Sequence, residues 1–340
     1  MLRCLELAAK GLGKTRSNPL VGAVIVHNDR IIGEGYHHEY GGPHAEVNAI
    51  NSVWNKNDLK NSILYVNLEP CSHYGKTPPC VHLIREFRIP RVIIGGSDPN
   101  PLVSGNGIRY LLDAGTEVIN GIIEDECRFL NRRFYTFYEK KRPYIILKWA
   151  QTRDKYIDNR ERGDMKNHPL RISGDLSGIL VHKWRSEEMA IMAGTNTINM
   201  DNPSLTVRHW TGDNPLRIVY LRKSPLRDGL NIMNDGHKTL IYTKNENLIK
   251  ANIENFLLSK VSIFPGNILD DLMKRNILSI IIEGGKELLE CFIETNLWDE
   301  ARIITGNINA GKGISAPLIS DCHFKCKIGD DELCIINRFT

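Results

Sequence analysis

Three short segments of the chain carry residue types that could hold a catalytic metal ion. His44-Ala-Glu46 is followed by Cys71 and then Cys80, and a proline stands directly before each cysteine. A catalytic zinc takes three protein ligands and leaves a fourth position open for water. One imidazole and two thiolates, from His44, Cys71 and Cys80, would supply such a set. Glu46, expected at the start of a helix, could reach the metal-activated water without binding the metal.

This set of residues predicts hydrolytic removal of an amine from a ring. Zinc lowers the pKa of its water toward neutrality, so Glu46 can take the proton and hydroxide can attack the carbon that bears the amine. Glu46 then returns the proton to the departing nitrogen. Zinc deaminases of nucleobases divide the work in this way and carry an H-x-E…P-C-x-x-C signature. A purely structural zinc would instead need a fourth ligand, and His73 is the nearby residue that could be one.

The loop between the two cysteines departs from that signature, because eight residues, Ser72 to Pro79, separate them. With this loop, the first half resembles the deaminase half of the bifunctional riboflavin-biosynthesis deaminase/reductase family. The resemblance covers about residues 1 to 140 and is carried by Asn18–Val26, Gly35–His37, Gly42–Ala49, Leu68–Cys80 and Asp98–Pro101. It implies a cytidine-deaminase-like domain that acts on a diamino-ribosylamino-pyrimidinone 5′-phosphate. The positions that match substrate contacts are Asn18, His73, Lys76, Asp98 and Asn100, although each would also suit a loop cap or a turn.

The second half gives a weaker signal from its residues alone. It lacks the G-x-G-x-x-G fingerprint of dinucleotide binding after a strand. A strand-like run ends in Glu283-Gly-Gly285 ahead of a helical pattern, and glycines at a helix N-terminus let a phosphate approach the backbone. An ordinary tight turn between a strand and a helix would have the same sequence pattern.

Further motifs are similar to the reductase half of the same family: Leu147–Ala150, Leu180–Arg185, Gly194–Thr197, Asp201–Arg208, Pro215–Val219, Glu283–Gly285 and Gly311–Gly313. The resemblance implies a dihydrofolate-reductase-like fold in which NADPH reduces the ribose of the deaminated product to a ribityl chain. The positions that match cofactor contacts are Ala150, Thr197, Asp201, Arg222, Gly285 and Lys286. Those that match substrate contacts are Lys148, Arg185, Leu205, Arg208 and Glu283, and the two arginines match ligands of the substrate phosphate.

Several alternatives to this interpretation stay open. Arg185 and Arg208 could form ordinary surface salt bridges. The turn at Thr152–Tyr156 lacks the family's glycine, and Leu170–Ser173 stands where the family often has Trp-Ile-Ser. A chain with an active deaminase and a silent reductase is therefore one competing hypothesis, and a zinc-stabilised metabolite-binding protein is another. A nucleic-acid base deaminase is a third, but the second half shows no basic or aromatic stripe.

The elements that must position these residues alternate between strands and helices in both halves. In the first half, a hairpin over 21–35 precedes strands at 63–68, 91–95 and 117–120 and helices at 44–53, 81–87 and 107–114. This order predicts a three-layer α/β sandwich. In the second half, strands at 216–221, 239–243, 279–282 and 301–305 alternate with helices at 175–187, 268–275 and 286–295. We therefore expect a second α/β domain with a mostly parallel sheet.

The junction of the two domains is expected where a helix over 123–138 runs into the charged stretch Glu139–Pro143. The predicted domains are a zinc-dependent pyrimidine deaminase at 1–142 and an NADPH-dependent reductase at 143–340. Since a domain typically holds ~150 residues, a chain of 340 residues has room for two.

Composition narrows the partners and the compartment. A net charge of +4 does not require a nucleic-acid partner and suits a small phosphorylated substrate met by a few cations. No apolar run reaches the ~20 residues that span a bilayer, and the first ten residues fit an amphipathic helix rather than a secretory signal. We therefore expect a cytoplasmic protein whose eight cysteines are reduced, with six of them outside the metal site. The family resemblance further implies a homo-oligomer, either a dimer or a tetramer.

Overall fold

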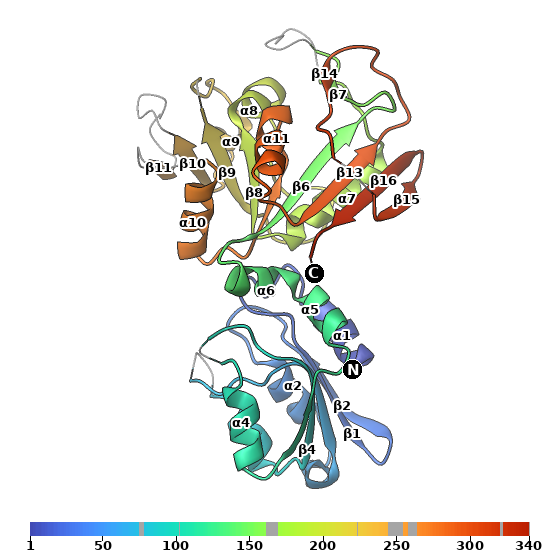
Figure 1. Ribbon diagram of the computed structural model, residues 1–340, viewed down its shortest axis with the longest axis vertical. Helices are drawn as coiled ribbons and strands as arrows, with labels where there is room; N and C mark the ends of the chain where they lie inside the picture. The colour runs from blue at the N-terminus through green and yellow to red at the C-terminus, as the bar shows by residue number, and fades with distance from the viewer. Residues whose placement is uncertain are drawn as a thin grey trace. The chain divides into compact units, whose positions relative to one another are not determined.

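The computed structural model divides the chain into two compact units, Met1–Lys141 and Arg142–Thr340 (Figure 1). The structure describes residues 1–74, 78–101, 103–160, 169–222, 224–243, 254–257, 264–319 and 322–339. The predicted substrate residue Lys76 lies outside these described residues. Within them, no helix is both long and apolar enough to cross a membrane.

The first unit is built on a five-stranded sheet of order β2-β1-β3-β4-β5. Its strands are β1 (Gly22–His27), β2 (Arg30–Tyr36), β3 (Ile63–Leu68), β4 (Arg91–Gly96) and β5 (Glu117–Asn120). Its helices are α1 (Leu2–Ala9), α2 (Ala45–Ser52), α3 (Cys80–Glu86), α4 (Asn106–Asp113), α5 (Glu124–Leu130) and α6 (Arg132–Glu139), with a 3₁₀ turn at Lys56–Asn61. The hairpin and the order of elements agree with the sequence prediction.

Alternation along β1 shows how the sheet is covered on both faces. Ala23 and Ile25 pack into the core beneath α2, α3 and α4, whereas Val24 points to the opposite face and packs against α1. Successive side chains of a strand point to opposite faces, so one strand serves two hydrophobic layers. On the α1 side, Gly95 of β4 lets Cys127 of α5 approach, since a Cβ there would lie 2.3 Å from its Sγ. The predicted three-layer sandwich is confirmed.

The single helix expected over 123–138 is wrong, because two helices, α5 and α6, meet at Asn131. Asn131 is 2% exposed, and its side chain both accepts from the backbone N–H of Leu20 (2.7 Å) and donates to its carbonyl (2.9 Å). An asparagine side chain can serve the backbone of a distant segment in this way while its own backbone leaves helical geometry. The helical hydrophobic pattern continues through the break and therefore hides it.

The second unit holds a nine-stranded sheet of order β11-β10-β9-β8-β12-β6-β13-β16-β15. Seven of its strands run parallel: β6 (Tyr144–Gln151), β8 (Ala190–Gly194), β9 (Leu216–Leu221), β10 (Thr239–Thr243), β11 (Glu254–Leu257), β12 (Ser279–Ile282) and β13 (Glu300–Thr305). The hairpin of β15 (Phe324–Ile328) and β16 (Asp331–Asn337) adds antiparallel strands beside β13. A separate two-stranded ribbon joins β7 (Tyr156–Asp158) to β14 (Ile314–Ser315). The mostly parallel sheet is as predicted.

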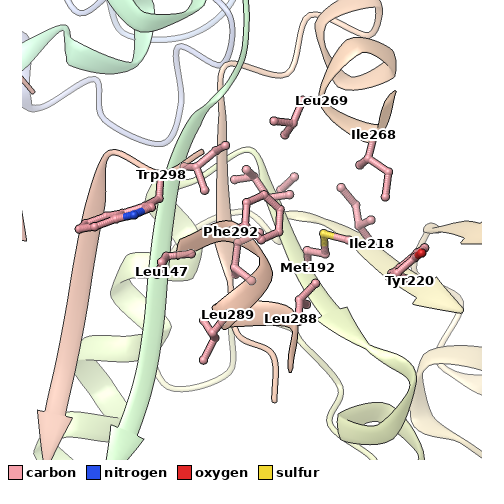
Figure 2. Packing of buried hydrophobic residues seen from close by; sticks show 14 of the residues in the cluster. Leu147, Met192, Ile218, Tyr220, Ile268, Leu269, Leu288, Leu289, Phe292 and Trp298 are labelled. Atoms are coloured by element: carbon pink, nitrogen blue, oxygen red, sulfur yellow. The ribbon is translucent and has the colours of Figure 1, made fainter. Parts of the chain in front are cut away.

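Helices cover both faces of this sheet, as a mainly parallel sheet requires. They are α7 (Asp175–Glu187), α8 (Thr195–Asp201), α9 (Asn231–Asn234), α10 (Gly266–Lys274) and α11 (Lys286–Glu294). Figure 2 shows one core of this unit, in which Leu288, Leu289 and Phe292 of α11 gather near Leu147 and Met192 of the sheet. A second core packs Val181 and Trp184 of α7 and Ile198 of α8 against the opposite face.

The expectation that all eight cysteines are reduced is wrong for two of them. Cys322 and Cys334 form a disulfide with a Cα–Cα separation of 5.8 Å, whereas the other six are free thiols. The hairpin brings them together, because the segment that enters β15 lies beside β16, where Lys325 is opposite Cys334. Proximity of this kind depends on strand register and cannot be read from the spacing of the cysteines.

Candidate functional site

The three predicted metal ligands converge at the carboxyl end of β3 in the first unit. His44 is the N-cap residue of α2, Cys71 follows β3, and Cys80 is the first residue of α3. His44 Nδ1 lies 3.4 Å from Cys71 Sγ and 3.3 Å from Cys80 Sγ, and the three ligand atoms all lie within 4.8 Å of one another. One imidazole and two sulfurs at this spacing fit the three-ligand set of a catalytic zinc.

Hydrogen bonding favours the charged forms of Cys71 and His44, and burial opposes it. The Cys80 hydrogen bond, with His44 adding to it, lowers the pKa of Cys71 to about 4, although burial opposes the change. The hydrogen bond with Cys71 raises the pKa of His44 to about 9, again against burial. The backbone N–H of Cys80, at the start of α3, also donates to Cys71 Sγ at 3.3 Å. The lowered pKa favours the thiolate form of Cys71, which is the form that binds a metal.

Glu46 lies in the first turn of α2 and is 3% exposed. Its Oε2 atom is buried without a hydrogen-bond partner among the described residues. Burial, and then the charge of Cys71, raise the pKa of this carboxyl. A buried carboxyl that has one unpartnered oxygen and a raised pKa is suited to exchanging a proton with a group bound beside it. The orphaned oxygen and the His-Cys-Cys donor set both fit a metal site that carries a ligand in its open position.

Asn18 is linked to this site through a histidine that the sequence analysis did not select. Asn18 Nδ2 lies 2.9 Å from Nε2 of His37, whose Nδ1 is 3.0 Å from the carbonyl of Pro43. The His37 ring meets the His44 ring edge-on at 5.5 Å between centroids. Asn18 is therefore connected to the metal ligand His44 through one intervening side chain, that of His37. His73, in the segment after Cys71, is exposed and so is not a buried fourth ligand.

Asp98 and Asn100 follow the neighbouring strand β4 and form a local turn. Asp98 is 7% exposed, and its Oδ1 accepts from the backbone N–H of Asn100 at 2.8 Å. Burial raises the pKa of Asp98 to about 7; the Asn100 N–H opposes this rise, and the charges of Glu69 and Cys71 add to it. Because β3 and β4 are parallel neighbours, the residues at their carboxyl ends reach the same edge of the sheet.

In the second unit, three predicted substrate residues form one buried charge cluster. Arg185 of α7 donates to both carboxylate oxygens of Glu283 at 2.8 Å, and Lys148 of β6 lies 3.6 Å from Glu283. Burial alone would raise the pKa of Glu283, but the Arg185 and Lys148 cations outweigh it and lower the pKa to about 2. Arg185 also donates to the carbonyl of Thr206 at 3.2 Å. The structure therefore pairs Arg185 with a buried carboxylate, in contrast to the exposed salt bridge considered above.

The predicted cofactor residues gather around the carboxyl ends of the parallel strands. Gly285 is the N-cap residue of α11, and a Cβ on it would lie 3.2 Å from Thr197 Oγ1 of α8. Ala150 is half-buried near the end of β6, whereas Arg222 is exposed just after β9. Lys286, the first residue of α11, is held by Ser315 at 2.7 Å. A small-molecule site at this edge is what open parallel sheets provide.

The remaining predicted residues, Asp201, Leu205 and Arg208, differ from one another in burial and in contacts. Asp201, at the end of α8, accepts from Arg160 Nη2 at 2.5 Å, and Arg160 is 4% exposed. No sequence pattern pointed to Arg160, because a single arginine after a short strand carries no signal. Leu205 is 2% exposed with a φ of 54°, so it supports the loop from inside. Arg208 is exposed, and its backbone N–H donates to His182 Nδ1 at 2.9 Å.

The fold and the metal-ligand set together define a zinc-binding deaminase domain joined to a second, reductase-type α/β domain. Residues 1–96 match the cytidine and deoxycytidylate deaminase zinc-binding region, and residues 143–335 match the RibD C-terminal domain. The second match alone covers more than half of the chain.

Relatives extend the similarity over nearly the whole chain. It is 37% identical to the riboflavin biosynthesis protein RibD of Aquifex aeolicus over 322 residues, which cover 93% of this chain and 88% of that protein. A RibD of Bacillus amyloliquefaciens is also 37% identical, over 94% of this chain and 87% of its own length. A crystal structure from Thermotoga maritima, titled a diaminohydroxyphosphoribosylaminopyrimidine deaminase/5-amino-6-(5-phosphoribosylamino)uracil reductase, superposes with a TM-score of 0.88 at 36% identity, covering 99% of this chain and 97% of that one. The chain belongs to the RibD family of bifunctional riboflavin-biosynthesis deaminase/reductases.

Proposed function

We propose that this chain catalyses two consecutive steps on one phosphorylated pyrimidine. The first unit hydrolyses the ring amine of a diamino-ribosylamino-pyrimidinone 5′-phosphate, and the second reduces the ribosyl chain of the product with NADPH. The observation that carries the proposal is the His44–Cys71–Cys80 cluster with the unpartnered Glu46 oxygen beside it. The relatives support the choice of substrate, since the Thermotoga maritima protein is named as both a deaminase and a reductase of such pyrimidines.

In the deaminase unit, His44, Cys71 and Cys80 would hold the zinc ion. When bound there, zinc supplies the positive charge that makes a water molecule acidic near neutral pH. Glu46 takes a proton from the attacking water and gives it to the departing nitrogen, which leaves as ammonia while the ring carbon gains a carbonyl oxygen. The raised pKa of Glu46 suits both transfers, because the carboxyl can hold the proton between them. Asn18, Asp98 and Asn100 bind and orient the pyrimidine, and the family resemblance adds His73 and Lys76 as further substrate contacts.

In the reductase unit, NADPH would lie along the edge formed by Ala150, Thr197, Asp201, Gly285 and Lys286, with Arg222 at its rim. The N-terminus of α11 offers backbone N–H groups and a glycine to a phosphate of the cofactor. NADPH supplies a hydride for the C1′ carbon of the ribosyl chain. Lys148 and Glu283 bind the substrate, and Leu205 shapes the wall behind it.

Of the two arginines expected at the substrate phosphate, Arg208 is the better placed. Its side chain is exposed, whereas Arg185 already donates to Glu283 through two nitrogens and to Thr206 through the third. A guanidinium that is not committed elsewhere can turn its paired N–H groups to a phosphate. Arg185 then acts chiefly by orienting Glu283.

A coupled assay tests both activities. Zinc-loaded protein should release ammonia from the pyrimidinone phosphate and then oxidise NADPH. The Glu46→Gln variant should lose ammonia release while it still oxidises NADPH with the deaminated intermediate. Arg208→Ala should raise the KM for the phosphorylated intermediate and leave that for NADPH unchanged. Normal ammonia release by Glu46→Gln would refute the deaminase mechanism, and an unchanged KM in Arg208→Ala would refute the phosphate role.

A further inference from the structure

One buried carboxylate of the deaminase unit takes no part in the chemistry described above. Glu69 directly follows β3, stands two residues before Cys71 and is 4% exposed. Its Oε2 accepts from the backbone N–H groups of Asp98 (3.2 Å) and Gly105 (3.0 Å). Its Oε1 accepts from those of Gly107 (2.9 Å) and Ile108 (3.3 Å). A single side chain therefore joins the metal-ligand segment to the start of the Asp98 loop and to the first turn of α4.

The joint is close-packed as well as hydrogen-bonded. A Cβ on Gly107 would lie only 2.1 Å from the carbonyl oxygen of Pro70, so α4 approaches the segment between Glu69 and Cys71 as closely as glycine permits. The backbone N–H of Glu69 also donates to the carbonyl of Gly96 at 2.9 Å. These contacts hold the end of β3 against the end of β4. Asp98 and Asn100 lie in the loop that follows β4.

We propose that Glu69 is a positioning residue of the deaminase site, which holds the Asp98–Asn100 loop at a fixed place relative to Cys71. The inference rests on the proposed deaminase function, in which Asp98 and Asn100 bind the pyrimidine and Cys71 holds the metal. Two groups on neighbouring strands can act on one ring only if their separation is set to within a fraction of an ångström. A carboxylate with two oxygens is the side chain that can accept from four N–H groups at once.

The charge of Glu69 also acts on Asp98. Glu69 and Cys71 near the end of β3, and the Asn100 N–H in its own loop, act on the pKa of Asp98. On α6, burial raises the pKa values of Tyr135 and Tyr138, and the charge of Asp98 adds to the rise, whereas Arg128 opposes it at Tyr135. The Tyr135 hydroxyl donates to the carbonyl of Ser97 at 2.7 Å. After burial, the carboxylate of Glu69 is the first of the named charges that raise the pKa of Asp98. Removing this charge should therefore let Asp98 ionise at lower pH.

The test compares Glu69→Gln and Glu69→Asp in the zinc-loaded, full-length protein, with exposed Glu86→Gln of α3 as the matched control. Ammonia release from the pyrimidinone phosphate gives KM and kcat. Glutamine offers one acceptor oxygen and turns an NH₂ group toward N–H donors, so we expect KM to rise about tenfold or more in Glu69→Gln. We expect kcat to stay within about threefold, since Glu46 and the metal ligands are unchanged. Glu86→Gln should match the wild type.

The pH dependence of kcat/KM supplies a readout that a merely structural role would not move. One limb of this pH profile should disappear in the Asp98→Asn variant, and that limb reports the ionisation of Asp98 in the free enzyme. In Glu69→Gln this limb should shift to lower pH, because the neighbouring negative charge is gone. Glu69→Asp keeps the charge but shortens the reach by one methylene, so it should raise KM and leave the limb in place.

The reductase activity of the same chain serves as an internal control of folding. NADPH oxidation with the deaminated intermediate, and the zinc content, should equal those of the wild type in each Glu69 variant. A wild-type KM and an unshifted limb in Glu69→Gln would overturn the proposal, as would a loss confined to kcat. If Glu69→Gln loses zinc or reductase activity, the KM of Glu69→Asp decides by the same criterion. Absence of ammonia release from the wild type would instead count against the proposed function.

Discussion

The buried cluster of Glu283, Arg185 and Lys148 gives a prediction whose size follows from the structure. Replacing Glu283 by glutamine keeps the shape of the side chain but leaves two cations buried side by side, with exposed fractions of 11% and 14%. Removing one partner of a buried ion pair typically costs about 3–5 kcal/mol of unfolding free energy. We therefore expect Glu283→Gln to destabilise the second unit strongly.

The pKa of Glu283 gives an independent magnitude. The neighbouring cations overcome burial and lower this pKa from 4.5 to about 2, a difference that corresponds to roughly 3 kcal/mol. A lowered carboxyl pKa contributes stability that is fully present above the unfolded-state value and is lost as pH falls toward the folded-state value. Because glutamine imitates the protonated acid, the wild-type advantage should be roughly 3 kcal/mol at pH 7 and only about 1.5 kcal/mol at pH 3.

Urea unfolding at several pH values provides the assay. Four of the five tryptophans, at positions 149, 184, 210 and 298, belong to this unit, so their fluorescence reports mainly its unfolding. In thermal unfolding, roughly 3 kcal/mol corresponds to a Tm lower by about 6–12 °C for a unit of this size. Glu332→Gln is the matched control, because Glu332 pairs with Lys325 at 3.4 Å but both side chains are more than half exposed. We expect it to change stability by less than ~0.5 kcal/mol.

Two results would refute this reasoning. If Glu283→Gln unfolds at the same urea concentration as the wild type, the cluster contributes no net stability. If the difference between the two proteins is the same at pH 3 and pH 7, the carboxylate charge is not its source.

Three further predictions concern the metal, the thiols and a second buried arginine. His44→Ala should bind less than one-tenth of the wild-type zinc in an elemental assay and lose ammonia release, while NADPH oxidation stays within about twofold, since the ligand set is confined to the first unit. In denaturant without reductant, six thiols should react with a thiol reagent, and prior reduction should raise the number to eight, because Cys322 and Cys334 are bonded to each other. Eight thiols without reductant would contradict the disulfide. Arg217→Ala should lower the unfolding free energy by about 3–5 kcal/mol in urea, because Arg217 is 1% exposed and is paired with Asp235 at 2.5 and 2.8 Å; a loss below ~1 kcal/mol would contradict its buried role.

The sequence predicted the fold wherever a hydrophobic period matched one element. The hairpin over 21–35 and the strands after it agree with β1 to β5, because each is a short run rich in apolar and β-branched residues. The same signal failed at Asn131, where helical periodicity runs through a break made by hydrogen bonds to Leu20, 111 positions away. It also left out β8, a buried strand directly before α8, whose short apolar run of Ala190–Gly194 carries no period of its own.

In the candidate site, too, some residues could be predicted from the sequence and others could not. His44, Glu46, Cys71 and Cys80 were predicted from residue types and spacing, because metal chemistry restricts the ligands to few side chains. His37 and Glu69 stood within recognised motifs, but nothing in the sequence showed that one contacts Asn18 and the other holds the Asp98 loop. Both act through hydrogen bonds to segments that only the fold brings near.

The sequence by itself determined the two α/β domains and predicted the candidate metal ligands and the acid–base role of Glu46, since each follows from local hydrophobic patterns or from a residue type with few substitutes. Only the tertiary structure decided which charges pair and which cysteines bond. Arg185 meets Glu283 98 positions away, and Cys334 meets Cys322 because two strands pair in one register. Such contacts depend on the packing of whole elements. The sequence around a charged residue or a cysteine does not identify its distant partner.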